Sequence, residues 1–360
     1  MSLRVGIVGL PNVGKSTLFN ALTKQGAKAQ NVPFTTIEPN VGAVAVPDER
    51  LSKLTEISES EKTTPTTIEF VDIAGLVRGA HEGEGLGNQF LANIREVDAI
   101  VHVVRFFEDA DITHVDTHVD PLRDTDTINT ELALADLNSV QKMRDNLEKK
   151  VKGNDKHSIL LDALLQKYEL ALAEGKPARS VEIEESEREV KTSVHLLTDK
   201  PVLYVANLSE AQITSADEIV HDFAQAHSPV LPLSIRIEQE LVELSDEERN
   251  SFLEEYGLPA TGLERLITAS YTLLDLITFF TSGKTESRAW TVKHGAAAPE
   301  AAGKIHSDME RGFIRAETVA YNDLLAAGSY AAARAAGKVR DEGKEYIVQD
   351  GDVMLFKFSA

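Results

Sequence analysis

One segment near the start of the chain, Gly9-Leu-Pro-Asn-Val-Gly-Lys-Ser16, has the residue types and spacing of a phosphate-binding loop. Its glycines let backbone N–H groups turn toward a phosphate, Lys15 would span the β and γ phosphates, and the Ser16 hydroxyl would bind Mg²⁺. The segment follows an apolar run at 5–8 and precedes a helical stretch, as such a loop requires. We therefore expect a nucleoside triphosphate site. The expected contacts in this loop are Asn12, Val13, Gly14, Lys15, Ser16 and Thr17.

Two further segments supply parts that such a site needs. Phe34-Thr-Thr-Ile37 offers Thr36 as a metal ligand, with Thr35 as a neighbour that caps or packs. Asp72-Ile-Ala-Gly75 ends an apolar run and brings a carboxylate to the metal and a glycine N–H to the γ-phosphate. The predicted metal ligands are Ser16, Thr36 and Asp72, and the predicted metal is Mg²⁺.

Short apolar runs separated by helical stretches predict the parallel sheet that must position these residues. Between the last two runs lies a helical hairpin: residues 129–151 are strongly helical, 152–156 break the pattern, and a second apolar helix face follows from Leu161 to Leu172. Residues from about 280 onward alternate as in a small α+β domain. The four runs are 4–9, 67–72, 99–104 and 202–206.

Charge is distributed unevenly along the chain. The 360 residues carry 37 Lys and Arg against 58 Asp and Glu, a net charge of −21, which argues against a polyanion-binding surface over the whole molecule. The hairpin arm and tip at 141–157 differ, with six bases and three acids. This stretch is either a solvated helix face or a local RNA contact.

Composition excludes several classes of protein. A hydrophobic content of 42% with 26% charged residues suits a globular protein of two or three domains, and the lack of cysteine excludes disulfides and thiolate metal sites. With no basic and apolar leader and no long apolar stretch, we expect a cytoplasmic protein without membrane contact.

The phosphate loop, Asn31-Val-Pro-Phe-Thr-Thr-Ile-Glu-Pro-Asn40 and Asp72-Ile-Ala-Gly-Leu-Val-Arg-Gly-Ala80 together resemble the Obg-related branch of translation-factor-like NTPases. With the helical insertion and the C-terminal segment, the whole chain resembles the YchF or Obg-like ATPase family. The resemblance implies an α/β fold: a Ras-like P-loop NTPase domain, a coiled-coil insertion, and a C-terminal α+β domain of ubiquitin-like shape, the TGS domain. The expected ranges are 1–127 with 201–276, then 128–200, and 277–360.

The residues expected around the base favour adenine. Guanine-specific relatives use Asn-Lys-x-Asp, whereas this chain reads Asn207-Leu208-Ser209-Glu210, which alters the carboxylate fork that binds guanine. Adenine would instead need an acceptor from Asn207 and a donor such as the Leu208 N–H. Ser234 stands where relatives place a loop against the base. The family resemblance also implies ATP, and GTP or dual use remains the alternative.

The water-positioning group is not the usual glutamine, because Leu76 follows the Asp72–Gly75 segment and a leucine cannot polarise water. His114 and His81 are the polar candidates, and His114 is preferred as the catalytic residue beside Lys15. Asn12 could hold K⁺ near the phosphates.

The sequence thus predicts a Mg²⁺-dependent ATPase, and the resemblance implies the ribosome as its partner. The alternatives are a GTP-driven ribosome-assembly factor and a nucleotide-responsive interaction or stress protein in which turnover is incidental.

Overall fold

The sheet that carries the phosphate loop has six strands in the order β2-β4-β1-β5-β6-β7. This computed structural model describes residues 3–28, 40–74, 86–109 and 118–359. All neighbouring strands are parallel except β2 and β4. The four predicted runs are confirmed as β1, β4, β5 and β6. The strands are β2 (Val41–Ala45), β4 (Thr67–Asp72), β1 (Arg4–Val8), β5 (Ala99–Arg105), β6 (Val202–Asn207) and β7 (Val230–Leu233).

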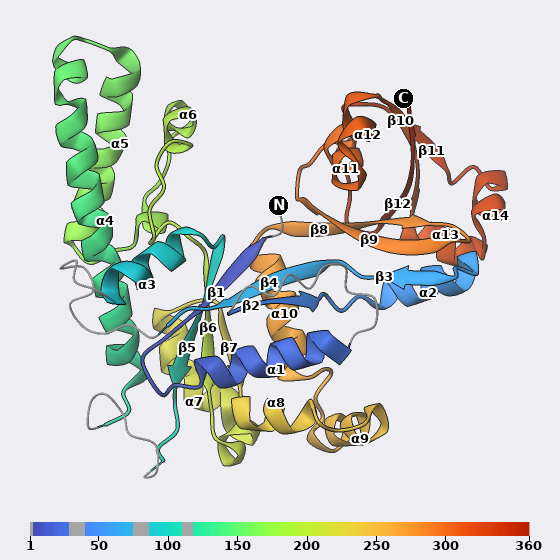
Figure 1. Ribbon diagram of the computed structural model, residues 1–360, viewed down its shortest axis with the longest axis horizontal. Coiled ribbons are helices and arrows are strands. Elements are labelled where there is room, and N and C mark those ends of the chain that lie inside the picture. The colour runs from blue at the N-terminus through green and yellow to red at the C-terminus, as the bar shows by residue number, and fades with distance from the viewer. Residues whose placement is uncertain (1–2, 29–39, 75–85, 110–117, 360) are drawn as a thin grey trace.

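Helices pack on this sheet and enclose the main hydrophobic core (Figure 1). α1 contacts β1, β2 and β4, while α10 contacts β5, β6 and β7. β5 and β6 are buried along their whole length, which is why both appear in the sequence as continuous apolar runs. The helices are α1 (Lys15–Lys28), α3 (Leu86–Arg95), α7 (Ala216–Ala226), α8 (Ile235–Leu241), α9 (Asp246–Tyr256) and α10 (Gly262–Leu273).

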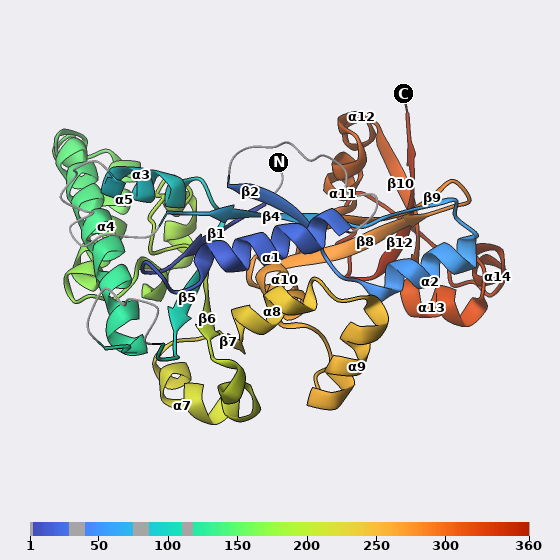
Figure 2. The same cartoon turned by 60° about the horizontal axis from the view of Figure 1, so that its bottom comes forward.

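The predicted helical hairpin is confirmed as α4 (Pro121–Lys152) and α5 (Lys156–Ala173), which project from one end of the molecule in both views (Figures 1 and 2). The short α6 (Arg188–Lys191) packs beside α5. Pro121 starts α4, and the Asp120 side chain accepts a hydrogen bond from the Arg123 N–H at 3.1 Å. The turn follows at Gly153.

The domain boundary expected at residue 128 falls inside a helix, because α4 begins seven residues earlier, at Pro121, and runs through it. Ile128 and Leu132 belong to the main core, whereas Val140 packs with α5. Asp136 joins the two regions by accepting hydrogen bonds from the N–H groups of Leu197 and Thr198. The first part of α4 therefore packs in the core of the nucleotide domain and attaches the helical hairpin to that domain.

A second sheet, in the order β11-β10-β12-β8-β9-β3, forms the other end of the molecule. β8 and β9 form an antiparallel hairpin, β12 lies parallel to β8, and α11 covers one face. This mixed sheet agrees with the α+β shape predicted. Its elements are β8 (Leu276–Ser282), β9 (Glu286–Lys293), α11 (Ala298–Ile305), α12 (Ser307–Arg311), β10 (Phe313–Ala320), α13 (Tyr321–Ala327), α14 (Tyr330–Ala335), β11 (Arg340–Glu342) and β12 (Asp352–Phe358).

One part of the predicted first domain lies in this second sheet. α2 (Glu49–Ser58) and β3 (Lys62–Thr64) fall within 1–127, yet β3 pairs with β9 and α2 packs against Phe280 and Val353. Blue α2 accordingly lies among orange and red elements in both views (Figures 1 and 2). The expected range was wrong here because sequence order says nothing about which sheet a three-residue strand joins.

No helix in the described ranges is long and apolar enough to cross a membrane.

Candidate nucleotide site

The phosphate loop connects the central strand β1 to α1, as the sequence predicted. Asn12 has a φ of 61° and Gly14 a φ of 104°, left-handed conformations that turn the backbone tightly. A side chain at Gly14 would lie 2.9 Å from Asn207 Nδ2, and one at Gly9 would lie 2.5 Å from the Val103 carbonyl oxygen. These two glycines are required by close packing as well as by backbone shape.

Lys15 is the first residue of α1 and is only 8% exposed. Its Nζ donates a hydrogen bond to the Leu10 carbonyl oxygen at 2.7 Å, so the ammonium lies back across the loop. Burial lowers the pKa of Lys15 to about 8, while the Asp72 carboxylate opposes that shift. A nucleotide phosphate would supply the negative charge that this buried ammonium needs.

Ser16 and Asp72 lie together, which agrees with their prediction as metal ligands. The Ser16 hydroxyl donates to Asp72 Oδ2 at 2.9 Å, while Asp72 Oδ1 is buried with no hydrogen-bond partner among the described residues. Two hard oxygen ligands, one of them anionic and unsatisfied, fit Mg²⁺. The third predicted ligand, Thr36, lies outside the described residues.

Asn207, predicted to contact the base, makes two contacts that the sequence did not predict. Its Nδ2 donates to the Val13 carbonyl oxygen at 3.0 Å, and its Oδ1 accepts from the Ile235 N–H at 3.1 Å. The Leu208 N–H donates to the Leu233 carbonyl oxygen at 2.9 Å. The Leu208 N–H therefore cannot serve as an adenine donor in this conformation. Asn207 joins the phosphate loop to the segment that starts α8.

Glu210 and Ser234 lie on the two segments that follow β6 and β7. Glu210 Oε1 lies 2.9 Å from Arg236 Nε, an ion pair that links these segments and that the sequence analysis missed. Ser234 is 2% exposed, and its Oγ has no partner among the described residues. The only signal for Arg236 was its place two residues after Ser234.

Arg105 is a second residue that sequence reasoning missed. It is 1% exposed at the end of β5, and its guanidinium donates to the carbonyl oxygens of Phe107 and Asp109. A charged residue ending an otherwise apolar run was the available signal. His81 and His114, the two histidine candidates, lie outside the described residues, and so does Leu76.

Comparison with known proteins places this geometry in a family. Residues 4–136 match the family model described as "50S ribosome-binding GTPase", and residues 276–359 match "YchF-GTPase C", described as "Protein of unknown function (DUF933)". The chain is 56% identical over 365 residues to the "Ribosome-binding ATPase YchF" of Bacillus subtilis (strain 168), covering all of both chains. The chain belongs to the YchF family.

Other YchF relatives agree over the same length. The "Ribosome-binding ATPase YchF" of Escherichia coli O157:H7 is 50% identical over 362 residues, with both chains fully covered. "Obg-like ATPase 1" of Oryza sativa subsp. japonica is 44% identical over 364 residues, covering 99% of this chain and 92% of the relative.

A solved YchF structure supports the same fold. The Schizosaccharomyces pombe YchF GTPase superposes with a TM-score of 0.88 at 38% identity, covering 99% of this chain and 98% of the other. The Ras-like domain, helical insertion and C-terminal domain therefore belong to one shared architecture.

Proposed function

We propose that this YchF family member hydrolyses ATP to ADP and phosphate in the cytoplasm and uses the nucleotide cycle to control its contact with the ribosome. The buried Lys15 beside the Ser16–Asp72 pair carries this proposal, because it combines a phosphate-binding cation with an incomplete set of metal ligands. The names of the full-length relatives, ribosome-binding ATPases, support both parts of it.

The loop residues have distinct proposed roles in hydrolysis. Lys15 contacts the β and γ phosphates, the loop N–H groups of Val13 and Gly14 bind the β-phosphate, and Thr17 closes the contact at the start of α1. Ser16, Thr36 and Asp72 hold Mg²⁺, which neutralises charge on the phosphate oxygens when bound. Positioning and charge stabilisation by these groups account for most of the catalysis expected in phosphoryl transfer.

Preference for ATP is proposed from the altered base segment. Glu210 is longer than the guanine-binding aspartate of GTPases, and Arg236 already pairs with it. Leu208 is buried beside Ala206 and Val220, so it cannot cover a base as the lysine of GTPases does. Both features remove favourable contacts to guanine, and a lost pair of hydrogen bonds changes discrimination strongly.

His114 is our proposed water-positioning residue, with His81 as the alternative. We also propose K⁺ as a second cation held by Asn12, whose left-handed conformation places it within the loop. Exchange of K⁺ for Na⁺ in the hydrolysis assay tests the cation separately from the histidine.

The hairpin tip is the proposed contact with ribosomal RNA, together with the C-terminal TGS-like domain. Lys149, Lys150 and Lys156 are exposed at the far end of α4 and the start of α5. Arg144, by contrast, pairs with Asp162 and Glu169 across the hairpin and serves the fold. A local basic tip on an acidic protein concentrates polyanion binding at one place.

Hydrolysis of ATP and of GTP, each with and without purified ribosomes, tests the proposal. We expect ATP to be preferred and ribosomes to co-sediment with the protein in a nucleotide-dependent way. The variant Lys149→Glu with Lys150→Glu should weaken co-sedimentation, whereas Lys24→Glu at an exposed position of α1 should leave it unchanged. Preferred GTP turnover would favour the assembly-factor alternative, and nucleotide binding without ribosome-linked turnover would favour the interaction-protein alternative.

A further inference from the structure

The β2–β4 hairpin of the nucleotide domain is joined to the C-terminal unit, which we define as residues 276–359. β2 and β4 pair in register, with Val41 opposite Val71, and the Asp72 N–H donates to the Asn40 carbonyl oxygen at 2.9 Å. The connection between the strands, residues 46–66, is not a short turn. We call it the coupling segment, and it contains α2 and β3.

The coupling segment is built into the second sheet at many points. β3 pairs with β9 from Lys62 opposite Glu286 to Thr64 opposite Arg288. The Glu61 N–H donates to the Lys284 carbonyl oxygen at 2.8 Å. Leu51 and Leu54 of α2 are buried in one cluster with residues of β8, β10 and β12. Movement of the hairpin base relative to the C-terminal unit would therefore break a continuous set of contacts.

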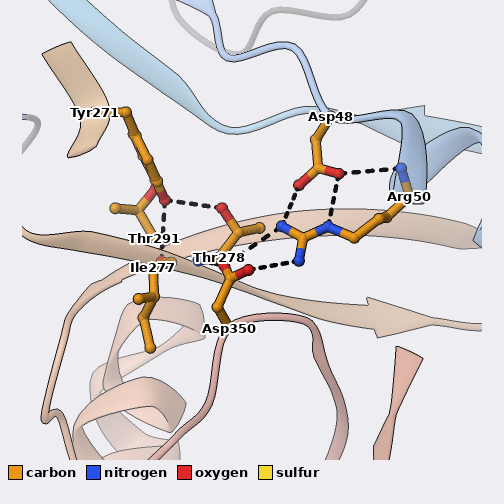
Figure 3. Close-up of polar contacts among 7 residues, drawn as sticks. All are labelled: Asp48, Arg50, Tyr271, Ile277, Thr278, Thr291 and Asp350. Atoms are coloured by element: carbon orange, nitrogen blue, oxygen red, sulfur yellow. Dashed lines mark hydrogen bonds and ion pairs between the residues drawn. The ribbon is translucent and has the colours of Figure 1, made fainter. Parts of the chain in front are cut away.

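Arg50 is the charged centre of this attachment (Figure 3). Its Nε and Nη2 donate to the two oxygens of Asp48 at 2.9 and 2.7 Å, and its Nη1 donates to Asp350 Oδ2 at 2.6 Å. The guanidinium also lies 5.2 Å from the Phe280 ring centre. Asp48 caps the start of α2. The Arg50 side chain therefore links the first part of the coupling segment to the loop that precedes β12.

A second group of contacts in Figure 3 brings in α10. Asp350 Oδ1 accepts from the Thr278 N–H at 2.9 Å. The Tyr271 hydroxyl lies 3.0 Å from the hydroxyls of Thr278 and Thr291, and Thr291 contacts Thr66 at 2.5 Å. Both ends of the coupling segment are thus linked through the C-terminal unit to a helix of the nucleotide domain.

The other end of β4 is the metal site. Asp72, its last residue, contacts Ser16, and β4 is paired with β1 on one side and β2 on the other. An extended strand of six residues spans about 20 Å, and its flanking pairs prevent it from buckling. A displacement at Thr66 is therefore carried along the strand to the Asp72 carboxylate.

We propose that the C-terminal unit controls magnesium and nucleotide binding through the β2–β4 hairpin, with Arg50 and Asp350 as positioning residues for the site. Because coupling between two sites is reciprocal, nucleotide binding must also change the stability of the β3–β9 pairing. A partner that binds the C-terminal unit would then sense the nucleotide without touching it. The inference rests on the Mg²⁺ ligands assigned under the proposed function.

The first part of the proposal is that the C-terminal unit controls Mg²⁺ binding. It is tested by measuring ATP hydrolysis by the full chain as a function of free Mg²⁺ concentration. We expect Asp350→Asn and Arg50→Met to raise the Mg²⁺ concentration for half-maximal rate about fivefold or more, with kcat at saturating Mg²⁺ nearly unchanged. Arg50→Lys should be intermediate, since lysine keeps the charge without the bidentate fork. The matched control is Asp323→Asn within the same C-terminal unit. It removes the ion pair in which Lys338 Nζ lies 3.1 Å from Asp323 Oδ1, and it should behave as wild type.

The second part of the proposal is that nucleotide binding changes the stability of the β3–β9 pairing. It is tested by hydrogen exchange of the full chain with and without Mg²⁺ and a non-hydrolysable ATP analogue. Slower exchange at residues 60–66 and 286–288 is expected in the wild type, and this response should be lost in Asp350→Asn. Exchange that does not respond in the wild type, or a Mg²⁺ dependence of Asp350→Asn equal to that of Asp323→Asn, would overturn the proposal. An unchanged Mg²⁺ dependence in Asp72→Asn would instead overturn the metal-site assignment.

Discussion

The Ser16 hydroxyl donates a hydrogen bond to Asp72 across 56 residues of sequence, which brings the start of α1 and the end of β4 to one point. The free oxygen of Asp72 is buried and lacks a partner among the described residues. A buried carboxylate oxygen without a partner is costly, and a bound cation removes that cost.

We expect Ser16→Ala and Asp72→Asn to lower ATP turnover while leaving the fold intact. Asp72→Asn should be the more severe, because it removes charge as well as a ligand, whereas water can replace a lost hydroxyl on Mg²⁺. Turnover measured across a Mg²⁺ titration, with circular dichroism as the fold control, decides this. Wild-type turnover in both variants at low Mg²⁺ would exclude this pair as the metal site.

ATP affinity should fall as pH rises above about 8. Burial lowers the pKa of free Lys15 to about 8, and bound phosphate raises it again, so binding at higher pH requires uptake of a proton. Calorimetric titration of a non-hydrolysable analogue between pH 7 and 9.5 measures this effect. Lys15→Arg, which stays charged throughout, should bind with a flatter pH profile. Equal slopes in the two proteins would show that another group titrates.

Base preference should shift toward GTP when Glu210→Asp is combined with Arg236→Ala. The shorter carboxylate, freed from its ion pair, can accept from guanine, and one such bond contributes about 1 kcal/mol, or roughly fivefold in the affinity ratio. Leu208→Lys is a poor addition because Leu208 is 1% exposed and a lysine there would bury a charge. An unchanged ratio of ATP to GTP affinity would place the preference elsewhere, with Ser234 the next residue to change.

His114→Ala should lower kcat by about a hundredfold or more while ATP affinity stays nearly constant, since the imidazole acts on water rather than on the bound nucleotide. Leu76→Ala is the control and should change kcat less. Steady-state kinetics with separate measurement of ATP binding distinguishes the two effects. Weaker binding with unchanged kcat would make His81 the better candidate.

Folding stability should fall in acid because of His102. Burial, with smaller contributions from His227, Lys15 and Arg179, lowers the pKa of His102 to about 3, so the unfolded chain binds a proton that the folded chain does not. Stability from this group is complete above about pH 6.5 and is lost as pH falls toward 3, at about 1.4 kcal/mol per unit.

Denaturant unfolding at pH 7 and pH 5 tests this. His102→Leu should lose less stability between the two values than the wild type, whereas a variant of the exposed His221 should match the wild type. Equal losses in all three proteins would assign the acid sensitivity to other groups.

The sequence by itself determined the features that depend on neighbouring residues. The phosphate loop lies within eight positions, and its flanking strand and helix are local, so pattern and context predicted Lys15, Ser16 and the surrounding turn. The buried strands were equally readable, because a strand covered on both faces needs a continuous apolar run. The periodic spacing of apolar residues predicted the two helices of the helical hairpin. The start of α4 was missed because its first turns pack against the core of the nucleotide domain and not against α5.

Only the tertiary structure decided the contacts between distant segments. The sequence predicted that Asn207 and Glu210 contact the base. Their observed partners are Val13, Ile235 and Arg236, which come from other loops. Whether a side chain has a free lone pair or N–H therefore depends on which loop packs against it. The same holds for Arg50 and Asp350, 300 residues apart. Local patterns record the preferences of one segment for helix, strand or turn, whereas the choice of partner depends on how all segments pack into shared cores, which is why β3 could join the distant β9.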